Sequence, residues 1–134
     1  ALPSNKEFFI VNTHMDAGRR DSDRSSRKKQ LEHIVSTISQ RTTTKALIVA
    51  GDLNLHSKNP EDVKLLENFK KELKLTDAFT GHKISEKWTI LDYFLYRQGE
   101  EVEFKIISAG EDKSFVTEEG PLSDHPALFI EISI

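Results

Sequence analysis

Short apolar runs separated by polar segments divide the chain into strands and helices. Aromatic and β-branched residues fill the run at 6–14, and apolar residues fill 46–53, so both runs predict strands. Three later runs, 88–96, 102–110 and 127–134, predict strands as well, and we expect 102–110 to pair with 88–96. Several of these runs are apolar at nearly every position, which is typical of strands buried on both faces.

Two segments have the spacing of amphipathic helices. Residues 22–41 carry one apolar stripe at helical spacing, formed by Leu31, Ile34, Val35 and Ile38. A second helix is predicted from residue 60 to about residue 74, because Asn-Pro-Glu-Asp at 59–62 supplies a capping amide, a proline in the first turn and acids at the positive end. The element order β-α-β-α-β-β-β predicts an α/β (α+β) fold, in which two helices cover one face of a mixed sheet.

One face of the predicted sheet has no covering layer in this sequence. The two helices cover one face, yet the apolar strands indicate that the other face is buried too. We assign Phe9, Val11, Val49 and Phe129 to this inner face and expect another polypeptide segment or a second copy to cover it. The shortfall is a first indication that part of the fold lies outside the chain.

Composition and charge narrow the possible functions. A length of 134 residues suits one domain or part of a larger one, and 37% hydrophobic with 31% charged residues is typical of a soluble globular protein. The formal net charge of −3 argues against a nucleic-acid binder that works through overall positive charge, so attraction of an anionic substrate has to be local or come from a metal. The absence of cysteine excludes disulfides and thiolate zinc sites. No apolar run approaches membrane-spanning length, and the compartment, cytoplasmic or secreted, stays open.

Groups that bind metals or transfer protons lie at or near the ends of four predicted strands. They are Asn12 and His14, Asp52 and Asn54, Asp92 with Trp88 on the same strand face, and Ser123-Asp124-His125. In an extended strand, positions 52 and 54 point the same way, and a carboxylate within an apolar run, as at position 92, is costly unless it is paired. Four such strand ends together indicate one site at the edge of a sheet.

Each of these groups also has a purely structural explanation. Asp52 and Asn54 suit a turn in which their side chains bond nearby backbone, and Asp92 suits a structural ion pair. His14 suits a hydrogen-bonded histidine at a strand end, and residues 123–125 suit a turn before a proline. Three consecutive residues cannot align as nucleophile, base and orienting group, so a serine-hydrolase triad is excluded there.

Two further features also have both a structural and a functional explanation. The basic segment from Arg19 to Lys29 suits either a solvated loop and helix start or a phosphate clamp. Trp88 suits either core packing or a platform for stacking a base.

Read as an ordered set, the motifs NTHMDAG, GDLN, LDYFL and SDH resemble the carboxy-terminal half of the endonuclease/exonuclease/phosphatase (deoxyribonuclease I-like) superfamily, from about residue 8 to residue 132. The resemblance implies one half of a four-layer α/β/β/α sandwich, with residues 1–134 as the carboxy-terminal half of the domain. In the family, the other half supplies an asparagine and a glutamate that is the main metal ligand, and neither motif is in this chain. We therefore expect the amino-terminal half of the same domain as a partner, and weak metal binding and little activity from this chain alone.

The resemblance also implies a role for each matching residue in a metal-dependent phosphoesterase. His125 would act as the base that prepares a water for attack on phosphorus, and Asp92 would orient its imidazole. Asp52 and Asn54 would position the attacking water and a phosphoryl oxygen. His14 would hydrogen-bond the phosphate, so His14 and Asn54 would bind substrate.

The cofactor implied by the resemblance is Mg²⁺ or Mn²⁺, held by Asp124 and Asp52. The substrate stays open among nucleic acid, phospholipid and small phosphate esters, because neither a basic surface nor an exposed apolar loop is evident in the sequence. The competing hypothesis is a non-catalytic interaction module built on a degenerate member of the same fold.

Overall fold

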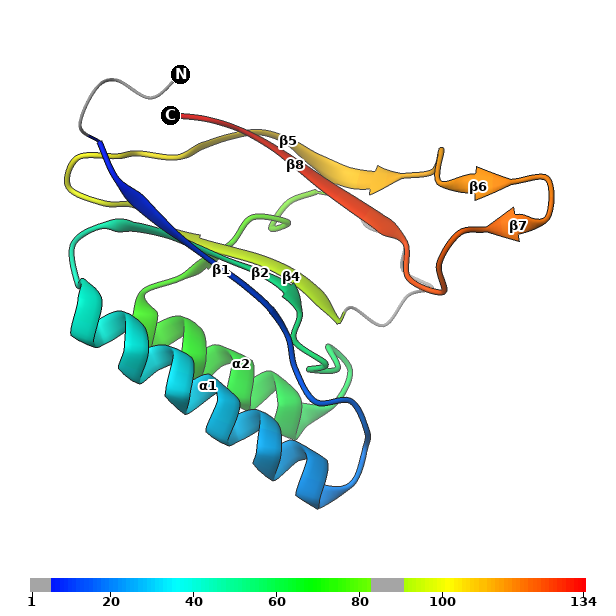
Figure 1. Cartoon of the computed structure of the whole chain (residues 1–134), viewed down its shortest axis with the longest axis horizontal. Coiled ribbons are helices and arrows are strands. Elements are labelled where there is room, and N and C mark those ends of the chain that lie inside the picture. The colour runs from blue at the N-terminus through cyan, green and yellow to red at the C-terminus, as the bar shows by residue number, and fades with distance from the viewer. Residues whose placement is uncertain (1–5, 83–90) are drawn as a thin grey trace.

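The computed structural model describes residues 6–82 and 91–134, which form a four-stranded sheet, two two-stranded sheets and two helices (Figure 1). The larger sheet has the strand order β1-β2-β4-β3, with β1 at Phe8–His14, β2 at Ala46–Asp52, β3 at Thr76–Asp77 and β4 at Asp92–Arg97. β1 and β2 are parallel, and β4 runs antiparallel to both β2 and β3. The predicted mixed sheet is therefore present, and the part of the strand predicted before residue 91 lies outside the described residues.

Both helices lie on the same face of the larger sheet (Figure 1). α1 at Asp21–Arg41 makes the crossover between the parallel strands, and α2 at Pro60–Leu73 follows β2. Asn59 caps α2 as predicted, because its Oδ1 accepts hydrogen bonds from the backbone N–H groups of Glu61 at 3.0 Å and Asp62 at 3.2 Å. The helices predicted at 22–41 and 60–74 are thus confirmed to within one residue at each end. No helix in the described part of the chain is long and apolar enough to cross a membrane.

The alternation of side chains along β1 and β2 decides which residues face the helices. Phe9, Val11 and Val49 pack with Leu31 of α1 and Leu66 of α2 in the main hydrophobic core. Our assignment of these three strand residues to the uncovered inner face is therefore wrong. The two strands were recognised, but the sequence pattern did not reveal which of their two apolar faces meets the helices.

The opposite face of the sheet is partly covered by a later part of the same chain. Phe8, Ala46 and Ile48 on this face pack against Val102 and Phe104 in a second buried cluster. The rings of Phe8 and Phe104 meet edge to face, with centroids 5.4 Å apart and planes at 87°. The expectation that nothing in the sequence could cover this face is therefore wrong.

The segment after Phe104 forms the second sheet. β5 at Lys105–Asp112 pairs antiparallel with β8 at Ala127–Ser133, and between them β6 at Val116–Thr117 and β7 at Gly120–Pro121 form a small hairpin. The predicted pairing of 102–110 with the strand before it is therefore wrong. The side chain of Gln98 donates to the carbonyl of Phe104 and accepts from the N–H of Phe104, so this backbone is satisfied without a strand pair.

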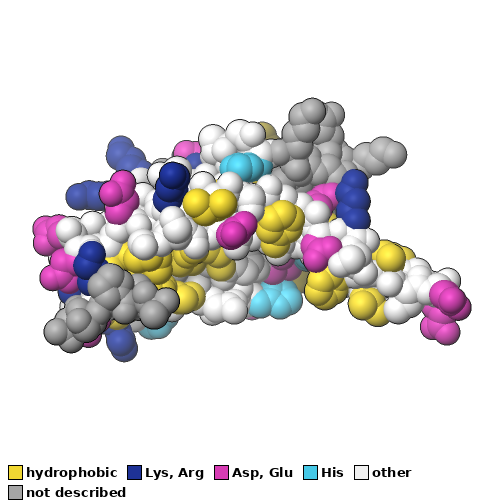
Figure 2. Space-filling model, turned by 90° about the horizontal axis from the view of Figure 1, so that it is seen from above, with side chains coloured by type: hydrophobic (Ala, Val, Ile, Leu, Met, Phe, Trp, Pro, Cys, Tyr) yellow, Lys and Arg dark blue, Asp and Glu magenta, His cyan; other side chains and the backbone are white. Residues whose placement is uncertain are grey.

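Part of the apolar surface stays exposed on the side away from the helices. Ile10 of β1 is 62% exposed, and Ile107 and Phe129 of the second sheet are 50% and 44% exposed. Figure 2 shows hydrophobic side chains grouped among charged ones in this view, with acidic side chains at the projecting end on the right. Coverage of this surface by a further segment or a second copy stays a prediction.

Candidate active site

Three of the predicted site residues lie side by side at one end of the larger sheet. His14 on β1 is the register partner of Asp52 on β2, and Asp52 is the register partner of Asp92 on β4. Because side chains alternate along a strand, all three share a face with Phe8 and Ile48, which is the face opposite the helices. Strand pairing alone therefore brings together three groups that are up to 78 residues apart in the sequence.

Gly51 allows β1 and β2 to approach closely beside this row. Its φ is +132°, a conformation that side-chain-bearing residues rarely adopt, and a Cβ atom there would lie 2.0 Å from the carbonyl oxygen of Thr13. A glycine before Asp52 is therefore required by the backbone, which explains why the apolar strand ends in Gly-Asp.

His125 reaches the row from the loop that precedes β8. Its Nδ1 lies 2.7 Å from Asp92 Oδ2, so the predicted contact between these side chains is confirmed. Its Nε2 lies 3.8 Å from Asp52 Oδ2, and Nε2 of His14 lies 3.5 Å from the same oxygen. The carboxylate of Asp52 thus lies between the imidazoles of His14 and His125. The carboxylate of Asp92 holds the imidazole of His125.

The surroundings of these groups differ in exposure. The side chains of Asp52, Asp92 and His125 are 13%, 25% and 29% exposed, whereas that of His14 is 74% exposed. His14 is therefore open to solvent and to a ligand, while the His125–Asp92 pair is partly shielded.

Asn54 lies close by but not in the way that strand alternation predicts. β2 ends at Asp52, and Asn54 follows it with a left-handed φ of +49°. Its backbone N–H donates to Asp52 Oδ1 at 2.8 Å, which is the local turn contact that we held as the structural explanation. Its buried side-chain amide donates to the carbonyl of Met15 at 2.8 Å and so joins the ends of β1 and β2. The inference that positions 52 and 54 project alike from one strand is therefore wrong.

The carboxylates around His125 favour its protonated form. The hydrogen bond to Asp92 raises the pKa of the His125 imidazole above its usual value, and the charges of Asp92, Asp52 and Asp124 act in the same direction. Partial burial opposes these effects without cancelling them. The contact therefore stabilises the fold fully below the unfolded-state pKa, near 6.5, and this contribution is lost as the pH rises through the raised pKa of the folded state.

We expect an NMR titration of the His125 imidazole in this chain to have its midpoint above pH 6.5. Asp92→Asn should move the midpoint down, because an amide cannot stabilise the imidazolium as a carboxylate does. Glu72→Gln, which removes an exposed carboxylate of α2 on the helix side of the sheet, serves as the matched control and should leave the midpoint in place. Equal midpoints for the wild type and Asp92→Asn would contradict the assigned contact.

The donor atoms that suit a metal ion form a small cluster. Asp52, Asp92 and His125 each offer one ligand atom, and these atoms lie within 4.8 Å of one another. The contact to Asp92 already occupies one side of His125, which leaves Asp52 as the best-placed oxygen donor. Mg²⁺ prefers oxygen ligands and is commonly bound by only one or two carboxylates, so the residues present fit part of such a site.

Asp124 does not join this cluster in the described residues. Its side chain is exposed, and it affects the site through its charge on His125. The prediction that Asp124 holds the metal with Asp52 therefore gains no support from the geometry. Trp88, which we placed on the strand face of Asp92, lies outside the described residues.

Two features that support the site were missed in the sequence. The hydroxyl of Tyr93 donates a hydrogen bond to the carbonyl of Leu55 at 2.8 Å and so holds the loop after β2.

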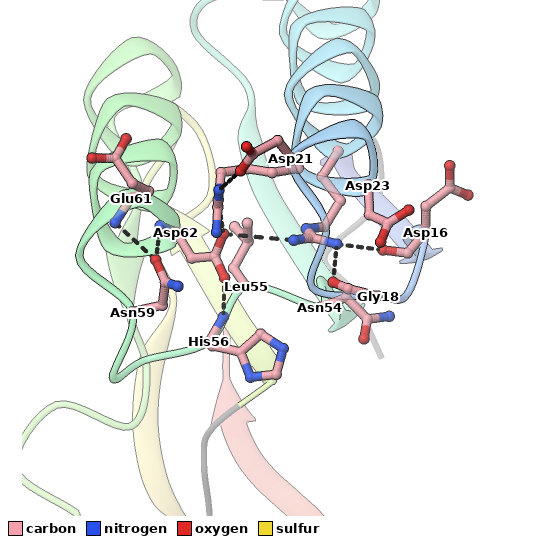
Figure 3. A network of polar contacts seen from close by, with 12 residues as sticks. Asp16, Gly18, Asp21, Asp23, Asn54, Leu55, His56, Asn59, Glu61 and Asp62 are labelled. Atoms are coloured by element: carbon pink, nitrogen blue, oxygen red, sulfur yellow. Dashed lines mark hydrogen bonds and ion pairs between the residues drawn. The ribbon is translucent and has the colours of Figure 1, made fainter.

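The second feature is a buried ion pair between the two helices. Arg27 and Asp62 are 0% and 1% exposed, and Nη2 of Arg27 lies 3.6 Å from Oδ1 of Asp62 (Figure 3). In the sequence, Asp62 has the position of an ordinary acid in the first turn of a helix. Only its burial in the structure reveals that it pairs with Arg27.

Comparison with known proteins identifies the fold. No family model and no curated protein matches the sequence. Among solved structures, a humanized TDP2 from D. rerio has a TM-score of 0.71 at 17% identity, over 98% of this chain and 54% of that chain. D. rerio TDP2 in complex with a single-strand DNA product has a TM-score of 0.69 at 15% identity, over 98% and 58% of the two chains. Sphingomyelinase C from Streptomyces griseocarneus has a TM-score of 0.54 at 14% identity, over 91% and 48%.

These neighbours confirm the predicted deoxyribonuclease I-like fold. Identities of 14 to 17% establish likeness in fold and nothing finer. The chain spans about half the length of the solved structures that it matches.

Proposed function

We propose that this chain, which has the deoxyribonuclease I-like fold over about half the length of its structural neighbours, is the carboxy-terminal half of a metal-dependent phosphoesterase domain. The observation that carries the proposal is the contact between His125 and Asp92, which holds the imidazole beside Asp52 and the end of β1. A carboxylate that holds a histidine next to a second carboxylate is an arrangement suited to removing a proton from water.

His125 is the proposed general base. With Asp92 accepting a hydrogen bond at Nδ1, the neutral imidazole takes a proton at Nε2, which is the nitrogen that lies 3.8 Å from Asp52. A water between Nε2 and Asp52 would be held by both groups and lose its proton to His125 as it attacks phosphorus. Asp92 is then the positioning residue that stabilises the imidazolium.

His14 is the proposed phosphate ligand, because its side chain is exposed and its Nε2 lies beside Asp52. Asn54 contributes differently from the sequence-based expectation. Its amide is buried and bonded to Met15, so we assign it the task of holding the ends of β1 and β2 at their spacing. The assignment of His14 puts the proposed phosphate on the face of the sheet opposite the helices.

Asp52 is the proposed ligand of a divalent cation, Mg²⁺ or Mn²⁺, in this chain. Such an ion would supply positive charge to offset the charge that develops on the phosphoryl oxygens and the leaving group. One carboxylate is a weak site by itself, which agrees with a domain whose other half provides further ligands. The amino-terminal half of the domain is accordingly the proposed partner.

The test is an assay of bis-p-nitrophenyl phosphate, DNA, short RNA and sphingomyelin. It is run on this chain alone and with the amino-terminal half of the domain supplied. We expect little turnover by the chain alone, turnover by the completed domain with Mg²⁺ or Mn²⁺, and its loss when a chelator removes the metal.

Turnover that persists unchanged in chelator would contradict the metal assignment. Lack of turnover of every substrate by the completed domain would favour the alternative function, a non-catalytic interaction module on the same fold.

A further inference from the structure

A cationic pocket lies at the start of α2, beside the loop that leaves the candidate active site. It has a volume of about 240 Å³ and is lined by Arg19, Arg24, His56, Lys58, Asn59 and Asp62. Three of these six side chains are permanently cationic and one is a carboxylate, in a chain whose formal net charge is −3. The lining of the pocket therefore carries net positive charge, although the chain as a whole is acidic.

The single carboxylate in the pocket is already neutralised. Asp62 Oδ1 lies 3.1 Å from Arg24 Nε and 3.6 Å from Nη2 of the buried Arg27, and Oδ2 accepts a hydrogen bond from the backbone N–H of His56 (Figure 3). An anion in the pocket would thus meet little repulsion from Asp62.

The remaining cations are available to a ligand. Arg19 and Lys58 are exposed, and within residues 6–82 and 91–134 neither takes part in an ion pair or a side-chain hydrogen bond. They stand on two different segments, the loop before α1 and the loop before α2, so a ligand between them would be held from two sides.

The pocket is close to the candidate active site along the chain. Four residues lead from Asp52 to His56, a stretch that spans at most about 14 Å even when fully extended. Asn54 and Tyr93 hold this stretch in place through their contacts to Met15 and Leu55. The pocket lies on the helix side of the sheet and Asp52 faces the opposite side, so a strand that holds one phosphate at each place has to pass around this end of the sheet.

We propose that this pocket binds a second backbone phosphate of a single-stranded nucleic acid whose scissile phosphate lies at the candidate active site. The proposal rests on the proposed function for the position of the first phosphate. It also supplies the local basic surface that the net charge of the chain does not provide. The basic segment from Arg19 to Lys29 had both a structural and a functional explanation. The proposal selects the phosphate clamp for Arg19, while Arg24 is paired with Asp21 and Asp62 and Arg27 belongs to the core.

The test measures binding by the whole 134-residue chain of a ten-nucleotide oligothymidylate at several salt concentrations. Arg19→Gln and Lys58→Gln should each weaken binding about three- to tenfold and reduce the slope of log K against log salt by about 0.7. Lys105→Gln removes one exposed positive charge at the start of β5 and should behave as the wild type. Inorganic phosphate should shift the NMR signals of Arg19, His56 and Lys58 in the wild type.

Binding by Arg19→Gln and Lys58→Gln equal to that of Lys105→Gln would overturn the proposal. Phosphate-induced shifts without any effect of the two variants on oligothymidylate binding would overturn the assignment of a nucleic-acid strand. The binding assay needs no turnover, so pocket-dependent binding by the chain together with no hydrolysis by the completed domain would count against the proposed function alone. Hydrolysis of bis-p-nitrophenyl phosphate with no pocket-dependent binding would count against this proposal alone.

Discussion

His125→Ala is expected to reduce metal-dependent phosphodiester hydrolysis by about 10²–10⁴-fold, the usual contribution of a positioned general base. A water must lose its proton as it attacks phosphorus, and His125 is the imidazole that a carboxylate holds next to Asp52. The measurement is kcat/KM for bis-p-nitrophenyl phosphate in the preparation that turns it over, with circular dichroism to show that the fold is intact.

Two companion variants separate the base from general effects on the site. Asp92→Asn should also slow the reaction and shift its pH dependence toward lower pH, because the loss of this carboxylate lowers the pKa of His125. Lys105→Ala changes an exposed residue of β5 and should leave kcat/KM unchanged. Full activity of His125→Ala at all pH values would show that another group is the base.

The pH profile of the wild type follows from the same contact. A base must be unprotonated, so activity should rise with pH through the pKa of His125, which its carboxylate neighbours hold above the ordinary value. Activity should therefore increase through the same pH range in which the contribution of the imidazolium–carboxylate contact to stability is lost.

Asp62→Ala is expected to reduce the free energy of unfolding of this chain by about 3–5 kcal/mol. The substitution leaves Arg27, which is 0% exposed, as a buried charge without its carboxylate, and it removes an acceptor from the backbone N–H of His56. Urea unfolding followed by circular dichroism measures the change.

The matched control is Glu67→Ala, which breaks an exposed ion pair with Lys70 on the same helix and should cost no more than about 0.5 kcal/mol. The double variant Asp62→Leu with Arg27→Met removes both buried charges and should recover much of the lost stability, since an apolar pair can replace a buried ion pair. A midpoint for Asp62→Ala equal to that of Glu67→Ala would show that the buried pair contributes little.

Local patterns were sufficient to predict most elements of the fold. The helical spacing of apolar residues located α1, and the Asn-Pro start located α2, because both signals depend only on residues within a few turns of each other. The positions of β1, β2, β4 and β8 followed from apolar and β-branched runs for the same reason. The approach of Asp92 to His125 was also predicted, through the family resemblance of the ordered motifs, and the structure confirms it.

Tertiary structure alone decided the features that depend on residues distant in the sequence. Phe9, Val11 and Val49 lie on apolar strands, and only the packing of α1 and α2 determines which face they join. The pairing of β5 with β8 joins segments that are distant in the sequence, and Gln98 satisfies the backbone of Phe104 just before β5. Arg27 belongs to a basic, polar-looking segment, yet it is buried because Asp62, 35 residues later, neutralises it. The sequence by itself therefore determined most of the elements and predicted the contact of Asp92 with His125. The faces, the pairing of β5 and the buried charges were decided by contacts between segments that no local pattern records.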